Sequence, residues 1–299
     1  MSAIGCKRAG EEGIQMLSYL LLGVSIFSMV LQNGLFNGVG KKYLKTGADT
    51  YYYNSFLYLV CILLFGIMAL GSGLSVFTGG WAMVFGVITM LSNFCKLRAL
   101  GTGPMHITIL ITTSSMIIPA LSGVILFDEA LHIGKLAAIA VLLFFIFLSV
   151  GKKGERSGSG KWFLYCALAF VFQGSIGVVQ KVHQSSVHKE ELFAFLAISF
   201  TCSFLIARIF AARGERTFRF DKKQYLFAFI CGLCTFTMNF LNLKLSGILP
   251  SQIFFPAVNG SAILFSSLCS VLVFREKVTT RQIIGLVGGF AALICICIW

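Results

Sequence analysis

Apolar residues divide this chain into long hydrophobic runs that are separated by short polar breaks. The runs cover residues 16–38, 51–71, 80–98, 104–127, 131–150, 162–181, 191–211, 224–244, 250–274 and 281–299. Most hold about 20 residues, and a helix of that length spans a hydrocarbon core of about 30 Å. The runs are continuously apolar rather than alternating, which favours helices over barrel strands. The pattern therefore predicts an all-α integral membrane protein with ten transmembrane helices.

Two polar segments frame this pattern. Residues 1–15 form a short polar leader, and no small-residue cleavage site follows the first run, so we expect an uncleaved first helix rather than a signal peptide. The longest break is 151–161, whose Gly, Ser and Lys content is typical of a flexible linker. We expect this linker to separate two units of five helices each, residues 1–150 and 162–299.

The two units repeat one another. Asn93-Phe94 and Asn239-Phe240 are 146 residues apart (239 − 93), and Glu129 and Glu276 are 147 apart (276 − 129). An offset held over a long stretch is the signature of an internal duplication. Because each unit has an odd number of helices, the second copy must enter the membrane from the opposite side. The sequence thus predicts two inverted five-helix repeats.

Composition supports the membrane assignment. The chain is 57% hydrophobic and 12% charged, with a mean hydropathy of +0.89, whereas soluble domains carry about 25% charged residues. The net charge of +13 comes from the loops and suits an anionic lipid surface better than nucleic acid. Nine of the ten cysteines lie in apolar runs, and none has a metal-ligand spacing with a histidine, so we expect neither a metal site nor a disulfide framework.

Several motifs carry a family resemblance. Leu97-Arg98-Ala99-Leu100 closes the third run and Pro104 opens the fourth, and Phe127-Asp128-Glu129-Ala130-Leu131 joins the fourth to the fifth. The second unit has Phe274-Arg275-Glu276-Lys277-Val278, followed by Gln282-Ile283-Ile284-Gly285. With these motifs the chain resembles the drug/metabolite transporter superfamily, in its ten-helix bacterial branch with two EamA domains. One departure is Cys95-Lys96, which stands where that family usually has an aromatic residue before Ala-Leu.

The resemblance covers nearly the whole chain and implies a multi-pass transporter of the cell membrane. It does not imply a substrate, because the superfamily handles amino acids, sugars, nucleotide sugars, organic phosphates and drugs. Members usually keep both termini in the cytoplasm. The basic loops after the first, fifth, seventh and ninth runs would instead place both termini outside by the positive-inside rule. The orientation therefore stays open.

The candidate site residues are polar side chains inside the runs. They are Gln32, Asn93, Lys96, His106, Gln173, Asn239, Asn242 and Asn259. Asn93 and Asn239 occupy matching positions in the two units, and Asn93 shares a helix face with Lys96. The structural alternatives are an interhelical hydrogen bond for each amide, a lysine that reaches the membrane surface, and a histidine that caps its helix. We expect Glu129 and Glu276 to cap or pair at the helix turns rather than bind substrate.

Acidic residues are confined to loops and run ends. A transporter that exchanges protons for a cationic drug usually needs a buried carboxylate, so their placement argues against cation export of that type. If Lys96 faces the cavity, the cavity is rich in amides and mildly cationic. This combination favours a zwitterionic, anionic or neutral polar metabolite.

We therefore expect a secondary transporter that works by alternating access, with its site between helices one, three, four, six, eight and nine. The alternatives are an integral-membrane enzyme acting on a lipid or isoprenoid phosphate, a drug exporter of the same superfamily, and a channel or scaffold. No catalytic residue or cofactor is expected, and the loop around His183 and Glu191 is interpreted as a solvated polar loop. The expected partners are a small-molecule substrate and the lipid bilayer, without nucleic acid, and a homodimer is left open.

Overall fold

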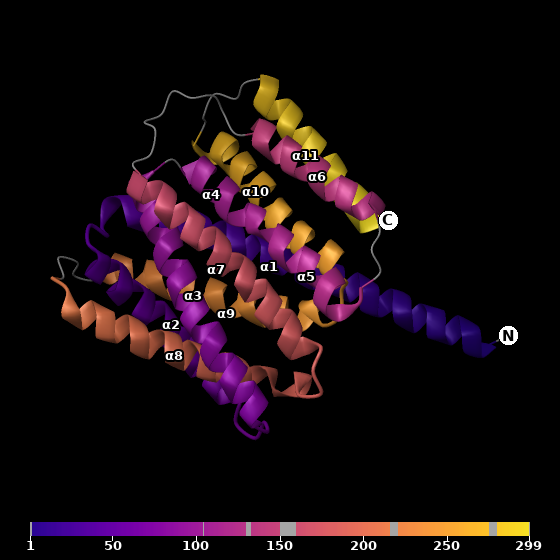
Figure 1. The fold of residues 1–299 in the computed structure, drawn as a ribbon, viewed down its shortest axis with the longest axis horizontal. Coiled ribbons are helices and arrows are strands. Elements are labelled where there is room, and N and C mark those ends of the chain that lie inside the picture. The colour runs from indigo at the N-terminus through magenta and orange to yellow at the C-terminus, as the bar shows by residue number, and fades with distance from the viewer. Residues whose placement is uncertain are drawn as a thin grey trace.

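A computed structural model describes residues 2–103, 105–129, 133–149, 160–215, 221–274 and 280–298, and within these ranges the regular structure is entirely helical (Figure 1). The elements are α1 (Ser2–Lys42), α2 (Gly47–Met68), α3 (Val76–Thr102), α4 (Met105–Thr113), η1 (Ser114–Met116), α5 (Ile117–Phe127), α6 (Ile133–Ser149), α7 (Gly160–Gln184), η2 (Lys189–Glu191), α8 (Leu192–Arg213), α9 (Lys222–Ser246), α10 (Ser251–Phe274) and α11 (Thr280–Ile298). Because α4, η1 and α5 follow one another directly, they form one interrupted segment. The described residues thus hold the ten helical segments that the apolar runs predict.

Membrane-spanning character is clearest in the longer helices. Six described segments are long and apolar enough to cross a bilayer. They are Met16–Lys42, Gly47–Met68, Val76–Thr102, Gly160–Gln184, Lys189–Arg213 and Lys222–Ser246. Ile111–Phe127 and Ile283–Ala292 add shorter apolar stretches. The chain is accordingly a multi-pass membrane protein.

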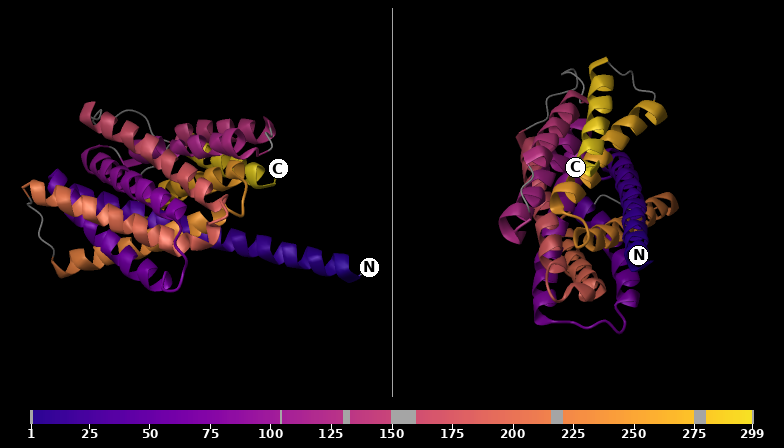
Figure 2. Two further views of the ribbon diagram at one scale, coloured as in Figure 1. Left: turned by 60° about the horizontal axis from the view of Figure 1, so that its bottom comes forward. Right: turned by 90° about the vertical axis from the view of Figure 1, so that its right-hand side faces the viewer.

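The polar leader does not stand apart from the first helix. α1 begins at Ser2 and ends at Lys42, so the described leader residues form the first turns of the first membrane helix. The leader contains no proline, and nothing in it forces a break. Figure 2 shows the N-terminal part of α1 projecting from the bundle.

The matched helices α3 and α9 begin in the same way. The Ser75 side chain accepts a hydrogen bond from the Thr78 N–H and caps α3, and the Asp221 side chain accepts one from the Gln224 N–H and caps α9. Such side-chain acceptors satisfy amide groups that the first helical turn leaves free. The two caps are 146 residues apart (221 − 75), which is the offset of Asn93 and Asn239. The duplication therefore extends to the helix starts.

Matched helices run in opposite directions. In the pair α2 and α8, the rings of Tyr51 and Phe210 lie 5.3 Å apart and those of Tyr58 and Phe200 lie 5.9 Å apart. Residue numbers thus rise along α2 as they fall along α8. In the pair α6 and α11, Arg281 at the start of α11 lies over the Phe147 ring near the end of α6. Antiparallel matched helices are what an inverted repeat requires.

The fourth segment breaks near its middle. Pro119 has no N–H group, and its ring would clash with the carbonyl of Ser115 in a regular α-helix. The chain takes a 3₁₀ turn at Ser114–Met116, which ends three residues before this proline. Pro256, in contrast, lies inside α10 without a break in the helix.

Candidate functional site

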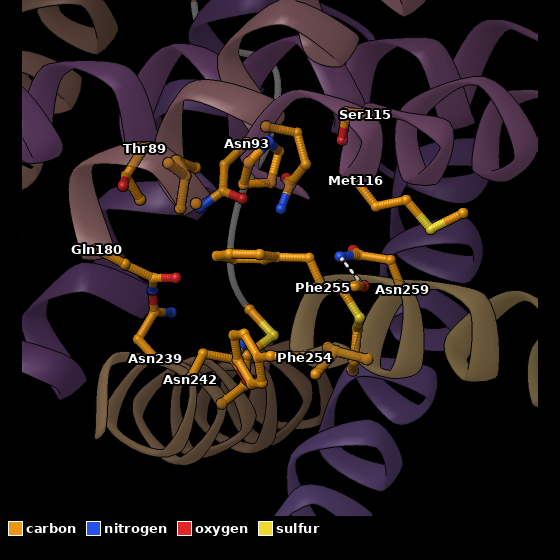
Figure 3. A pocket seen from close by; sticks show the side chains of 17 residues that line it. Thr89, Asn93, Ser115, Met116, Gln180, Asn239, Asn242, Phe254, Phe255 and Asn259 are labelled. Carbon is orange, nitrogen blue, oxygen red and sulfur yellow. Dashed lines mark hydrogen bonds between the residues drawn. The ribbon is translucent and has the colours of Figure 1, made fainter. Parts of the chain in front are cut away.

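A pocket lies between α1, α3, the η1–α5 segment, α7, α9 and α10, which are the six helices predicted to form the site (Figure 3). Its lining residues are Met29, Thr89, Asn93, Ser115, Met116, Pro119, Gln173, Ile176, Gly177, Gln180, Met238, Asn239, Asn242, Phe254, Phe255, Val258 and Asn259. Most lie well inside their helices rather than at the ends. The pocket is therefore enclosed by both halves of the chain.

The matched asparagines face this pocket from α3 and α9. Asn93 donates a hydrogen bond of 3.1 Å from Nδ2 to the Tyr58 hydroxyl, and Asn239 donates one of 2.8 Å to the Thr235 carbonyl. These bonds orient both amides, and each uses one of the two N–H donors of its side chain. The side-chain carbonyl oxygens have no hydrogen-bond donor among the described residues, so a solute can supply one.

Two further predicted amides line the pocket with partly used hydrogen-bonding capacity. Gln173 accepts a hydrogen bond of 3.1 Å from the Ser92 hydroxyl at Oε1. Asn242 accepts one of 2.6 Å from the Ser25 hydroxyl at Oδ1. An amide has two acceptor lone pairs and two donors, so the amino groups of both side chains remain to donate to a solute.

Asn259 and Thr89 leave polar atoms without a partner. Asn259 donates a hydrogen bond of 3.0 Å from Nδ2 to the Phe255 carbonyl, while its Oδ1 has no partner among the described residues. The Thr89 hydroxyl is likewise buried without a partner there. A buried polar atom that makes no hydrogen bond costs about 1–3 kcal/mol. Both atoms border the pocket, where a solute could satisfy them.

The remaining predicted residues lie elsewhere. Gln32 is buried between helices, and its Nε2 donates a hydrogen bond of 2.6 Å to the Thr235 hydroxyl on α9. Lys96 is 6% exposed, lies outside the pocket lining, and makes no hydrogen bond or ion pair with another described residue. His106 lies in the first turn of α4, and its side chain lies outside the described part of the chain.

Gln180 is a lining residue that the predicted set did not include. It lies on α7 seven residues after Gln173 (180 − 173), which brings both side chains to one face of the helix. That spacing was the available signal. The apolar lining residues carried no comparable signal, because phenylalanine and methionine occur throughout the chain.

One wall of the pocket is apolar. Phe254 and Phe255 on α10 form an edge-to-face ring pair with centroids 4.9 Å apart. Figure 3 shows the Phe255 side chain reaching across the pocket, between Asn93 and Asn242. A Cβ atom at Gly177 would lie 2.8 Å from this ring and 2.8 Å from Pro119. The glycine therefore permits the close approach of α7 that holds the ring in place.

A buried ion pair lies beyond one end of the pocket. Asp128 ends α5 in a left-handed conformation (φ 50°), which turns the chain so that Glu129 points back into the bundle. The Glu129 carboxylate accepts hydrogen bonds from the N–H and hydroxyl of Ser251, the first residue of α10. It also pairs with Lys181 on α7 at 2.8 Å. The prediction that Glu129 caps or pairs at a helix turn is confirmed, whereas Glu276 lies outside the described residues.

The polar loop before α8 fastens helices together. The Glu191 carboxylate accepts hydrogen bonds of 2.9 Å and 2.8 Å from the N–H and hydroxyl of Ser75, and it contacts His188 at 3.3 Å. Among the described residues, no group of three histidine, cysteine or acidic side chains is placed to hold a metal ion. Within the described part of the chain, this loop joins the start of α8 to the start of α3.

Comparisons with known proteins identify a matching family and a similar solved structure. Residues 160–298 match the EamA-like transporter family. A protein of known crystal structure superposes with a TM-score of 0.72 at 11% sequence identity, covering 94% of this chain and 96% of its own. At that identity the likeness shows the fold alone. No curated protein matches the sequence.

Proposed function

We propose that this chain, whose residues 160–298 match the EamA-like transporter family, is a secondary transporter that moves a small polar metabolite by alternating access. The observation that carries this proposal is the placement of Asn93 and Asn239. These residues are matched across the duplication, and both line one pocket between inverted halves.

The inverted arrangement supplies the mechanism. Because matched helices run antiparallel, a tilt that opens the pocket toward one membrane face has a counterpart that opens it toward the other. A solute held by residues from both halves stays in place while the halves move around it. We assign substrate contact to the lining amides, which are Asn93, Gln173, Gln180, Asn239, Asn242 and Asn259.

The amides suit this task because each supplies both donors and acceptors. Hydrogen bonds of moderate strength hold a polar solute without trapping it, and release on the far side requires that binding be weak enough to reverse. Gln32, which is already bonded to Thr235, is assigned to helix packing in this scheme.

The test is counterflow in proteoliposomes with radiolabelled amino acids, sugars and nucleosides. Saturable exchange of a labelled solute is the expected result, and Asn93→Leu and Asn239→Leu should each abolish it while the protein remains monodisperse. Asn54→Leu is the matched control, because Asn54 is a fully buried amide on α2 outside the pocket lining. Full exchange in both pocket variants would remove the proposed site, and flux that never saturates would indicate a channel.

A further inference from the structure

Among the described residues, no ionisable side chain lines the pocket. All seventeen residues that line it are uncharged. Lys96 lies outside the lining, and Glu129 and Lys181 neutralise each other beyond it. Removing a charged group from water costs several kcal/mol unless an opposite charge or a metal compensates. A solute with a net charge therefore finds no counter-charge among the described lining residues.

The same lining suits a solute with many hydrogen-bonding groups. Free acceptors come from the carbonyl oxygens of Asn93 and Asn239, and from the unpartnered Oδ1 of Asn259. Free donors come from the amino groups of Gln173 and Asn242, whose oxygens are already engaged. Donors and acceptors thus occur together, as the separated charges of a zwitterion or the polar edge of a neutral heterocycle require.

The apolar wall adds a shape requirement. Phe255 presents its side chain across the middle of the pocket (Figure 3). Space beside its ring is limited, because a Cβ added at Gly177 would lie 2.8 Å from the ring. Aromatic rings held in this way favour offset or edge-to-face contact with another flat ring. Met29, Met116 and Met238 line the same space and adapt to the outline of a ring.

We infer that the transported solute has no net charge and combines a flat unsaturated ring with several hydrogen-bonding groups. This inference rests on the proposed function and deepens it. Nucleosides and zwitterionic aromatic amino acids share this chemistry. Phosphorylated solutes and organic cations carry a net charge, and sugars and aliphatic amino acids have no flat unsaturated ring.

A matched ligand panel tests the inference by thermal shift of the purified protein and by counterflow. One arm uses tryptophan, with tryptamine as its cation and indole-3-propionate as its anion. The other arm uses uridine and uridine monophosphate, and glutamine serves as the ringless zwitterion. We expect tryptophan or uridine to raise Tm and to exchange, and the charged analogues and glutamine to do neither. The arm that responds shows whether the ring comes from an amino acid or from a nucleoside. A stronger response to a charged analogue or to glutamine would overturn the inference.

Counterflow of a charged or ringless solute leaves the transporter assignment standing and removes the inference about the substrate. Binding of tryptophan or uridine without any flux would leave the inference about the ligand standing and remove the transporter assignment.

Two variants test the lining itself. Phe255→Leu removes the ring while keeping an apolar side chain, and it should weaken binding of the responding ligand about ten-fold. Phe265→Leu on the same helix is the control, because Phe265 is 41% exposed on the surface of the bundle. Equal affinities in the two variants would show that no ring contact exists.

Asn242→Asp adds a carboxylate to the pocket and retains the acceptor for Ser25. It should make tryptamine the preferred ligand of the indole series. An unchanged preference in a folded N242D protein would contradict the electrostatic argument. If N242D does not fold, the charge series on the natural protein decides the same point.

Discussion

Glu129 and Lys181 form a 2.8 Å ion pair that joins the two halves of the molecule. Their side chains are only 15% and 11% exposed, and each has a second anchor. Glu129 bonds the first residue of α10, and Lys181 donates a hydrogen bond of 3.2 Å to the Ser246 carbonyl at the end of α9. The pair thus ties α5, α7, α9 and α10 together at one end of the bundle.

Removing one charge of this pair should destabilise the protein. Glu129→Gln keeps an acceptor for Ser251 but leaves Lys181 without a counter-charge, and breaking such a pair costs about 3 kcal/mol. We expect a lower Tm by differential scanning fluorimetry. Glu190→Gln is the control, because Glu190 is exposed on η2, and it should leave Tm unchanged. The double variant Glu129→Gln/Lys181→Gln should recover part of the loss, and a purely additive loss would mean that the two charges do not interact.

Replacing Asn33 or Asn54 should keep or raise the stability of the protein rather than lower it. Both side chains are fully buried, and neither amide has a hydrogen-bond partner among the described residues. Replacing an unsatisfied polar group by an apolar one of similar size is close to neutral or stabilising, here by about 1 kcal/mol. Asn33→Leu and Asn54→Leu should therefore keep or raise Tm. A fall of several degrees in either variant would reveal a polar partner such as a buried water.

Gln32 separates a packing role from substrate contact. Gln32→Leu breaks a buried 2.6 Å bond to Thr235, and such interhelical bonds contribute about 0.6 kcal/mol on average in membranes. We expect a small fall in Tm with unchanged substrate affinity, measured by saturation of counterflow. A double-mutant cycle with Thr235→Val should show coupling between the two positions. A large loss of affinity in Gln32→Leu would place this residue in the site after all.

Gly177 tests the position of the Phe255 ring. In Gly177→Ala, the added methyl group lies 2.8 Å from Phe255 and Pro119, so the ring must move or the helices must separate. Overpacking of this kind costs about 1–3 kcal/mol. We expect lower Tm and weaker counterflow. Gly66→Ala on α2 is the matched control, since nothing lies within 4 Å of its added Cβ. Equal behaviour of the two variants would show that the contact yields without consequence.

The fold was accessible from sequence because run length and the repeat offset can be read without knowing how the helices pack. The apolar runs located ten helical segments, and the offset of Asn93 and Asn239 identified residues that line one pocket. The rotation of each helix about its axis was less accessible. In a membrane, lipid and protein interior are both apolar, so a helix carries little of the polar stripe that marks the outer face of a soluble one.

Gln32 and Lys96 illustrate this difficulty. Both are polar residues within apolar runs, and both lie outside the pocket lining. The partner of Gln32 is decided by how α9 presents Thr235, which is a property of packing rather than of the local sequence. The break at Ser114–Met116 was similarly hidden, because Pro119 disrupts its helix whereas Pro256 does not.

That break places a point of possible bending in the fourth segment, beside the pocket. A short 3₁₀ turn inside a longer helix concentrates bending at a few residues, while the flanking turns remain stiff. Ser115 and Met116 belong both to this turn and to the pocket wall. Bending at this turn would change the shape of the pocket through one helical segment. In the proposed transport cycle, the pocket could therefore begin to open locally, before the two halves tilt.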